Sequence, residues 1–193
     1  MILTLDTGAI TGWASGNPGD EPRWGAEDFH AKTTGEVLYR LRSWLGGKCI
    51  EIEPDLIAFE SPYVPRIGKR GPPPNAKTIR RLHAFAGCVE EVGWELGIKV
   101  YEVSILDIAQ FFIGTRTLRR EQKKAATVEM CRRYGWPTGC DNEADALAIW
   151  CMAEAQIAPL IAARRGAGPL FIPRNSARPS VEEPESCLQR GFV

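Results

Sequence analysis

Apolar and polar residues alternate along several short stretches of the chain, and a period of two predicts β-strands. Segment 16–20 (Gly-Asn-Pro-Gly-Asp) has the composition of a tight turn between two of these stretches. A later apolar run ends in an acid, which is typical of a short buried strand. We expect five strands, over residues 1–6, 11–15, 23–29, 55–60 and 98–103.

Elsewhere apolar residues recur every three or four positions, which predicts amphipathic helices. Gly46-Gly47 is expected to end the first helix and Gly97 the second, and Ser104 is expected to cap the third. The helices are expected over residues 37–45, 76–96, 105–112, 119–134 and 141–163. This order predicts an α/β fold with a mixed five-stranded sheet flanked by helices: an antiparallel meander first, then parallel strands.

Two segments depart from these periodic patterns. Residues 61–75 hold five prolines, so they can form neither a helix nor a central strand. From Gly166 onward the chain carries four prolines and little periodicity. We therefore expect one folded domain over residues 1–163, followed by a C-terminal tail or arm over residues 164–193.

Composition is that of an ordinary globular protein, with 44% hydrophobic and 25% charged residues. No apolar run approaches the roughly 20 residues of a membrane span, and Asp6 comes too early for a signal peptide, so we expect a cytoplasmic protein. The six cysteines include no CxxC pair, and His30 and His83 are the chain's two histidines. We expect neither a zinc site nor a disulfide framework, but mostly buried cysteines.

Formal net charge is zero, yet the charges are unevenly distributed. Residues 1–60 hold ten acids and five bases, residues 66–81 hold six bases and no acid, and residues 116–133 hold seven bases and two acids. The basic stretches are either solvated helix faces or a basic surface around an acidic centre. A phosphodiester-processing enzyme would need the second arrangement.

Four acids stand at the ends of predicted elements. Asp6 closes the first strand and Glu60 the fourth, and a parallel arrangement would bring both to the same edge of the sheet. Asp141 and Asp145 begin the last large helix, on one face of it. Clustered carboxylates repel one another, and Mg²⁺ or Mn²⁺ would relieve that repulsion. Two such ions about 4 Å apart activate water and stabilise the leaving oxygen in phosphodiester hydrolysis.

Each acid taken alone has an ordinary alternative explanation. Asp141 or Asn142 could simply cap the helix, and Glu60 could be a surface acid at the end of a strand. Asp6, inside an apolar strand, is harder to explain without a partner, because burying a charge is costly. The four acids together are much more specific than any one of them.

Three motifs resemble those of RuvC-type Holliday junction resolvases. Residues 5–14 (LDTGAITGWA) resemble the first motif of that family, residues 56–60 (LIAFE) the second, and residues 144–149 (ADALAI) the last. Segment 121–124 (EQKK) lies where the family carries a basic segment. The resemblance covers about residues 1–158. It implies a ribonuclease-H-like fold, a homodimer, and paired symmetric nicks at a four-way DNA junction, in a bacterial cell or a phage-infected host.

By the same resemblance, Asp6, Glu60 and Asp145 are ligands of two Mg²⁺ ions, for which Mn²⁺ would substitute. Many relatives carry a fourth acid three residues before the last one, where this chain has Asn142. Asp141 keeps the same helical face and is our candidate for the fourth ligand, whereas Glu143 points roughly the opposite way.

Basic residues near these acids are expected to contact DNA, together with Tyr63, which stands where relatives place an aromatic thought to probe the junction centre. The expected DNA contacts are Tyr63, Arg66, Lys69, Arg70, Lys77, Arg80, Arg81, Arg116, Arg119, Arg120, Lys123 and Lys124. The alternative for Tyr63 is that its aromatic side chain packs under the proline-rich loop.

Other functions explain fewer of these features. Residues 6–9 (DTGA) match the aspartic-protease tetrad, but the chain has no second Asp-Thr-Gly or Asp-Ser-Gly and too many long helices. An actin- or hexokinase-like ATP-binding protein would need two lobes. A broader structure-selective nuclease for forks, flaps or branched DNA, a nuclease for RNA–DNA hybrids, and a non-catalytic junction-binding relative remain as alternatives.

Two further expectations concern apolar residues. Five residues of the long helix, at 82, 85, 89, 92 and 96, form a stripe that faces either the core or a dimer partner. The six tryptophans are expected to be core or near-core residues.

Overall fold

A mixed five-stranded sheet forms the centre of the computed structural model, which describes residues 1–62 and 75–164. The strands are β1 (Ile2–Asp6), β2 (Ile10–Gly16), β3 (Arg23–Asp28), β4 (Leu56–Glu60) and β5 (Lys99–Val103), in the spatial order β3-β2-β1-β4-β5. The first three strands pair antiparallel, whereas β4 runs parallel to both β1 and β5. The predicted α/β class and mixed sheet are confirmed.

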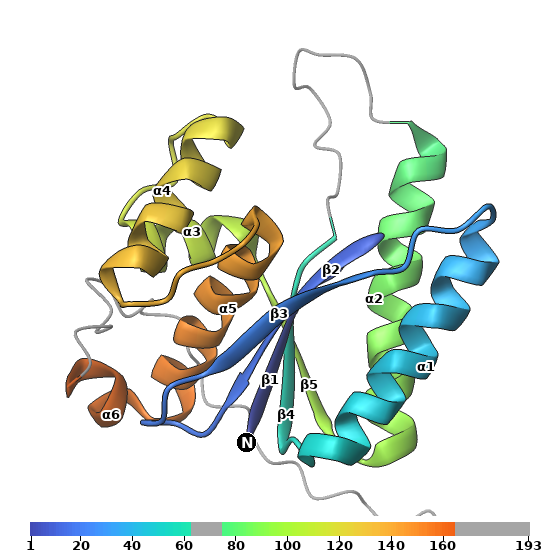
Figure 1. Ribbon diagram of the computed structural model, residues 1–193, viewed down its shortest axis with the longest axis horizontal. Helices are drawn as coiled ribbons and strands as arrows, with labels where there is room; N and C mark the ends of the chain where they lie inside the picture. Colours follow the sequence, from blue (N-terminus) through green and yellow to red (C-terminus); the bar gives the residue numbers. More distant parts are fainter. Residues whose placement is uncertain (63–74, 165–193) are drawn as a thin grey trace, which may run out of the picture.

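Helices cover both faces of the sheet (Figure 1). On one side lie α1 (Thr34–Ile52) and α2 (Ala76–Leu96). On the other lie α3 (Ile105–Ile113), α4 (Arg120–Arg133), α5 (Asp141–Ile157) and the short α6 (Pro159–Arg164). Helix α5 packs on the sheet itself, and α3 and α4 pack against α5. Gly97 ends α2 and the Ser104 hydroxyl caps α3, as predicted.

Two predicted helix ends are wrong. Helix α1 continues through Gly46-Gly47 to Ile52, because its buried face continues past the glycines to Cys49. Burial of that face outweighs the roughly 1 kcal/mol that a helical glycine costs. The helix expected over 141–163 is two helices, since α5 ends at Ile157 and Pro159 begins α6. Proline supplies no N–H for a continuing helix but suits a first turn.

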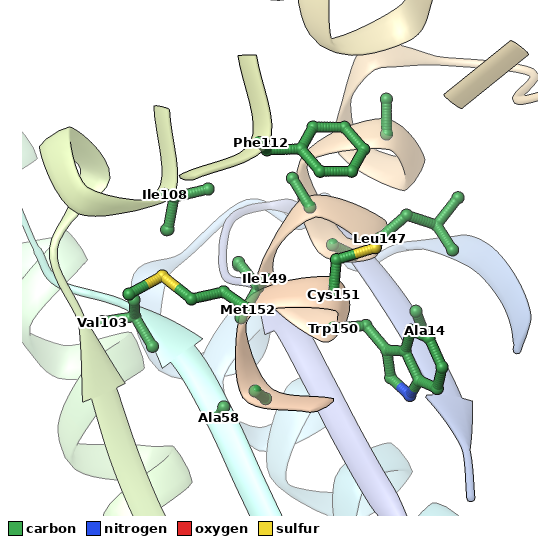
Figure 2. Close-up of a cluster of buried hydrophobic side chains, with 14 of the residues drawn as sticks. Ala14, Ala58, Val103, Ile108, Phe112, Leu147, Ile149, Trp150, Cys151 and Met152 are labelled. Atoms are coloured by element: carbon green, nitrogen blue, oxygen red, sulfur yellow. The ribbon is translucent and has the colours of Figure 1, made fainter. Parts of the chain in front are cut away.

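Side chains of β1 alternate between the two faces of the sheet. Leu3 and Leu5 pack in the apolar cluster shared with α1 and α2. Ile2 packs in the cluster built around α5, shown in Figure 2, and Thr4 donates a hydrogen bond to a carbonyl of α5. Since the period of a strand is two, Asp6 follows Ile2 and Thr4 onto the α5 side.

Side chains of β4 alternate between the two faces of the sheet in the same way as those of β1. Ile57 and Phe59 pack with α1 and α2, whereas Ala58 packs with α5. Glu60 is in phase with Ala58 and therefore also opens toward α5. The alternation of two neighbouring parallel strands thus directs both strand-end acids to the face that α5 covers.

Several expectations about buried residues hold, with exceptions. Cys49, Cys88, Cys131 and Cys151 are buried and unpaired, Cys140 is half-buried, and Cys187 lies outside the described residues. The stripe of α2 packs mainly in the core, through Phe85, Val89 and Val92, although Leu96 is 40% exposed.

The expectation that all six tryptophans are core or near-core residues is wrong for Trp94, which is 85% exposed near the end of α2. The side chain of Trp94 points away from the apolar face that α2 packs against the sheet. No helix in the described part of the chain is long and apolar enough to cross a membrane.

Candidate metal centre

Asp6 and Glu60 lie side by side at the carboxyl ends of β1 and β4. Leu5 and Phe59 are register partners in this parallel pair, so the next residues, Asp6 and Glu60, end neighbouring strands at the same edge of the sheet. Burial is the main cause that raises the pKa of Asp6 well above its usual range, and repulsion from Glu60 adds to it. The juxtaposition expected from the sequence is therefore present.

Helix α5 brings the other two acids to the same place. Asp141 is its first residue and Asp145 lies one turn later, and the charges of both contribute to the raised pKa of Asp6. Burial raises the pKa of Asp145 to about 6. Burial, followed by repulsion from Asp145, raises the pKa of Glu60 to about 7. These raised pKa values mark a site where negative charge accumulates without enough compensation.

Helix α4 supplies positive charge beside the acids. The Lys124 ammonium forms an ion pair and hydrogen bond with the Asp141 carboxylate, which holds the pKa of Asp141 below its usual value. Lys123 and Arg120 lie close enough to lower the pKa values of Glu60 and Asp145. The part of the basic segment that borders the acidic centre is therefore Arg120, Lys123 and Lys124.

Contacts in the first turn of α5 distinguish between Asp141, Asn142 and Glu143 as candidates for the fourth metal ligand. Cys140 is the N-cap residue, so neither Asp141 nor Asn142 is the helix cap. The Glu143 carboxylate accepts a hydrogen bond from the Gly139 N–H at 2.6 Å, and Glu143 does not contribute to the shifted pKa values of the other acids. Asp141 is thus the acid of this turn that interacts with Asp6.

The oxygen donors of these acids are of the kind that a divalent cation prefers, but the side chains do not lie close enough together to hold one. In residues 1–62 and 75–164, no three Asp, Glu, His or Cys side chains stand close enough together to hold a metal ion. The donors are nevertheless the hard carboxylate oxygens that Mg²⁺ and Mn²⁺ prefer. A cation would also relieve the burial and repulsion that raise the pKa values of Asp6, Glu60 and Asp145. Binding one would require these side chains to move closer together and the ion to replace Lys124 at Asp141.

The residues expected to contact DNA have different surroundings. Tyr63, Arg66, Lys69 and Arg70 lie outside the described residues. Lys77 and Arg80 are exposed on the first turns of α2, and Arg81 is half-buried there. Arg116 forms an ion pair with Asp107 at 2.6 Å, and Arg119 is exposed just before α4. Arg120, Lys123 and Lys124 border the acids.

Sequence reasoning missed two residues that attach α5 to the sheet. Thr4 is fully buried, and its hydroxyl donates to the Ala146 carbonyl at 2.8 Å. A side chain at Gly12 would overlap the Asn142 carbonyl. The period-two alternation contains a signal for Thr4, because a polar residue in phase with Ile2 and Asp6 must be buried with them.

Comparison with known proteins shows the fold. No family model matches the chain, and no curated protein matches it in sequence. The solved structure of Thermus thermophilus RuvC matches 87% of this chain and 98% of its own, at 19% identity and a TM-score of 0.57. T. thermophilus RuvC in complex with Holliday junction substrate gives the same coverage, 17% identity and a TM-score of 0.59.

The yeast mitochondrial Holliday junction resolvase Ydc2 matches 84% of this chain and 83% of its own, at 13% identity and a TM-score of 0.50. Matches at sequence identities this low show a shared fold; they do not show a shared activity. The extent of the match, over 84–87% of this chain, shows that the three structures share their overall fold with it. The chain therefore has the ribonuclease-H-like fold of RuvC-type resolvases.

Proposed function

We propose that this protein is a metal-dependent endonuclease that resolves Holliday junctions by paired, symmetric nicks. The observation that carries the proposal is the convergence of Asp6, Glu60, Asp141 and Asp145 from two strand ends and one helix, beside a basic helix. A solved structure of the same fold, that of T. thermophilus RuvC, contains a Holliday junction substrate.

The four carboxylates would hold two Mg²⁺ ions, with Mn²⁺ as a substitute. Bound at this centre, the ions would activate a water molecule and stabilise the leaving oxygen of a phosphodiester. The protein's own residues prepare the site. Asp6, Glu60 and Asp145 are acids with raised pKa values, so they would give up protons on becoming ligands. Asp141, now paired with Lys124, would bind an ion in place of that ammonium group.

Helix α4 would hold the DNA strand over the acids. Arg120 and Lys123 lie near Glu60 and Asp145, so their cationic ends can bind the phosphate oxygens on either side of the scissile bond. Lys124, once separated from Asp141, can donate to the same phosphate. Tyr63 would probe the junction centre, as the resemblance implies, and the basic residues of segment 66–81 would contact phosphates of the DNA.

A second protomer would place a second site on the opposite strand, and this would produce symmetric cuts. The two-metal mechanism, the homodimer and a cytoplasmic location in a bacterial cell or phage-infected host belong to this proposal. Most of the apolar stripe of α2 is buried in the core, so a dimer interface would use other surfaces.

The deciding experiment compares substrates side by side in Mg²⁺: a synthetic four-way junction, a flap, a fork, a linear duplex and an RNA–DNA hybrid. We expect cleavage of the junction by two nicks at symmetry-related positions, and no cleavage by Asp6→Asn. Cleavage of forks and flaps at equal rates would indicate a broader structure-selective nuclease. Equal binding of the junction with no cleavage by either protein would indicate a non-catalytic relative.

A further inference from the structure

Helix α5 runs along a strip of small residues on β2. Gly12 is the register partner of Asp6, Ala14 of Thr4 and Gly16 of Ile2, so this strip lies beside the face of β1 that carries Asp6. Gly12 approaches the backbone of Asn142, and Gly16 approaches the Trp150 ring. The helix therefore lies directly on β2, with its first turn at the end of the sheet that carries the acids.

The approach at Gly12 is between two backbones. A Cβ atom there would overlap the carbonyl oxygen and carbon of Asn142, and would lie 3.0 Å from the Glu143 nitrogen. Backbone atoms cannot rotate away as a flexible side chain can, so any side chain at this position must displace the first turn of α5. Asn142 follows Asp141 directly and precedes Asp145 by less than one turn.

Thr4 holds the next turn of α5 against β1. Its fully buried hydroxyl donates to the Ala146 carbonyl at 2.8 Å, next to Asp145 in sequence, and lies 3.3 Å from the Ala14 carbonyl. Gly12 and Thr4 thus contact α5 at two points that bracket Asp145, one through close approach and the other through a hydrogen bond.

We propose that Gly12 and Thr4 are positioning residues that set the depth of the first turns of α5, and thereby allow Asp141 and Asp145 to share metal ions with Asp6 and Glu60. This inference rests on the proposed function. Neither residue touches the metal or the DNA. Each acts through the backbone to which two of the four ligands are attached.

The test compares Gly12→Ala with Gly16→Ala, which crowds the same strand at its other end. A Cβ atom at Gly16 would meet the Pro22 Cα at 3.2 Å and the Trp150 ring at 3.3 Å, far from the acids. Binding of Mn²⁺ is measured by electron paramagnetic resonance without DNA, and thermal unfolding is measured in EDTA. We expect Gly12→Ala to weaken Mn²⁺ binding at least tenfold, and Gly16→Ala to lower the Tm while binding Mn²⁺ like the wild type.

Amide hydrogen exchange supplies a second readout that needs no metal. In Gly12→Ala the amides of residues 142–147 should exchange faster than in the wild type, and in Gly16→Ala they should not. Thr4→Val, which keeps the shape but removes the hydroxyl, should weaken Mn²⁺ binding about threefold. If Gly12→Ala does not fold, the Mn²⁺ affinity of Thr4→Val by itself tests the positioning role.

The other outcomes overturn the inference in distinguishable ways. Wild-type Mn²⁺ affinity in Gly12→Ala, or in Thr4→Val if that variant stands alone, shows that these residues do not position the ligands. Equal weakening in Gly12→Ala and Gly16→Ala shows an effect of general packing. If the wild type itself binds no Mn²⁺, the proposed metal centre fails, and this inference fails with it.

Discussion

Three half-buried carboxyl groups, those of Asp6, Glu60 and Asp145, determine how the acidic centre responds to pH. The pKa of Glu60 is raised to about 7 and that of Asp145 to about 6, and the pKa of Asp6 is raised as well, in each case chiefly because burial disfavours the charged form. Glu60 and Asp145 therefore exchange protons near neutral pH, in the same range in which they would bind metal. Protons and metal ions would therefore compete for the same carboxylates.

Stability of the metal-free protein should therefore fall as the pH rises from about 5 to 8. The pKa of Glu60 is higher in the folded protein than its ordinary value of 4.5, so the folded state binds more protons than the unfolded chain across this window. Deprotonation through the folded pKa removes that advantage, on the order of 1–3 kcal/mol. Thermal unfolding in EDTA at each pH measures the loss, and saturating Mg²⁺ should offset it.

Glu60→Gln should reduce the slope of this pH dependence, because the amide stays neutral at every pH, while Asp6 and Asp145 keep their own contributions. Glu90→Gln, at an exposed position on α2, is the matched control and should retain the wild-type slope. A wild-type Tm that is constant from pH 5 to 8 in EDTA would contradict the raised pKa values.

Asp141 and Glu143 should differ sharply in their importance for cleavage. Asp141 interacts with Asp6 and Lys124, whereas the Glu143 carboxylate accepts a hydrogen bond from the Gly139 N–H. We expect Asp141→Asn to slow junction cleavage at least a hundredfold and Glu143→Gln to slow it less than threefold, measured under single-turnover conditions. The reverse ranking would assign the fourth ligand to Glu143.

The positions of the strands along the chain were predictable because the local pattern of apolar and polar residues determines them. Alternation in β1 and β4 identified the strand ends, and a parallel pairing was enough to bring Asp6 and Glu60 together. Helix ends were less predictable where packing overrides local preference. Gly46-Gly47 does not stop α1, since the tertiary contacts of Cys49 and its neighbours extend the helix beyond them.

Contacts between elements distant in sequence could not be read from the local pattern. Lys124 was expected to bind DNA, and its pairing with Asp141 depends on how α4 packs against α5. The role of Gly12 depends in the same way on the path of α5 over β2. Residue type and periodicity carry no information on such distances, which arise only when the layers pack.

The two ends of α4 should contribute differently to DNA binding. Arg120 and Lys123 lie beside the acids, whereas Arg132 and Arg133 at the other end form ion pairs with Glu129. We expect Arg120→Ala and Lys123→Ala each to weaken junction binding about tenfold in Ca²⁺ and to reduce the salt dependence by about one phosphate contact. Arg132→Ala is the control. Equal losses at both ends would indicate a uniform electrostatic effect.

Zero net charge conceals a division of the protein into an acidic sheet edge and basic surroundings. The first 60 residues carry twice as many acids as bases, and the helix that borders the acids is basic. Basic residues around the acids can attract a phosphate backbone to this edge of the sheet. Association with junctions should therefore depend more strongly on salt than the overall charge suggests.

Paired nicking requires two active sites that act on one junction, and a mixture of wild-type and inactive subunits tests this requirement. A cruciform in a supercoiled plasmid becomes linear after two nicks in one binding event and an open circle after one. With a ninefold excess of Asp6→Asn over wild type, most active subunits would have an inactive partner, so open circles should replace linear product. Wild type alone should give linear product and sediment as a dimer at micromolar concentration. A monomer with and without junction DNA, or linear product that persists in the mixture, would refute the paired mechanism.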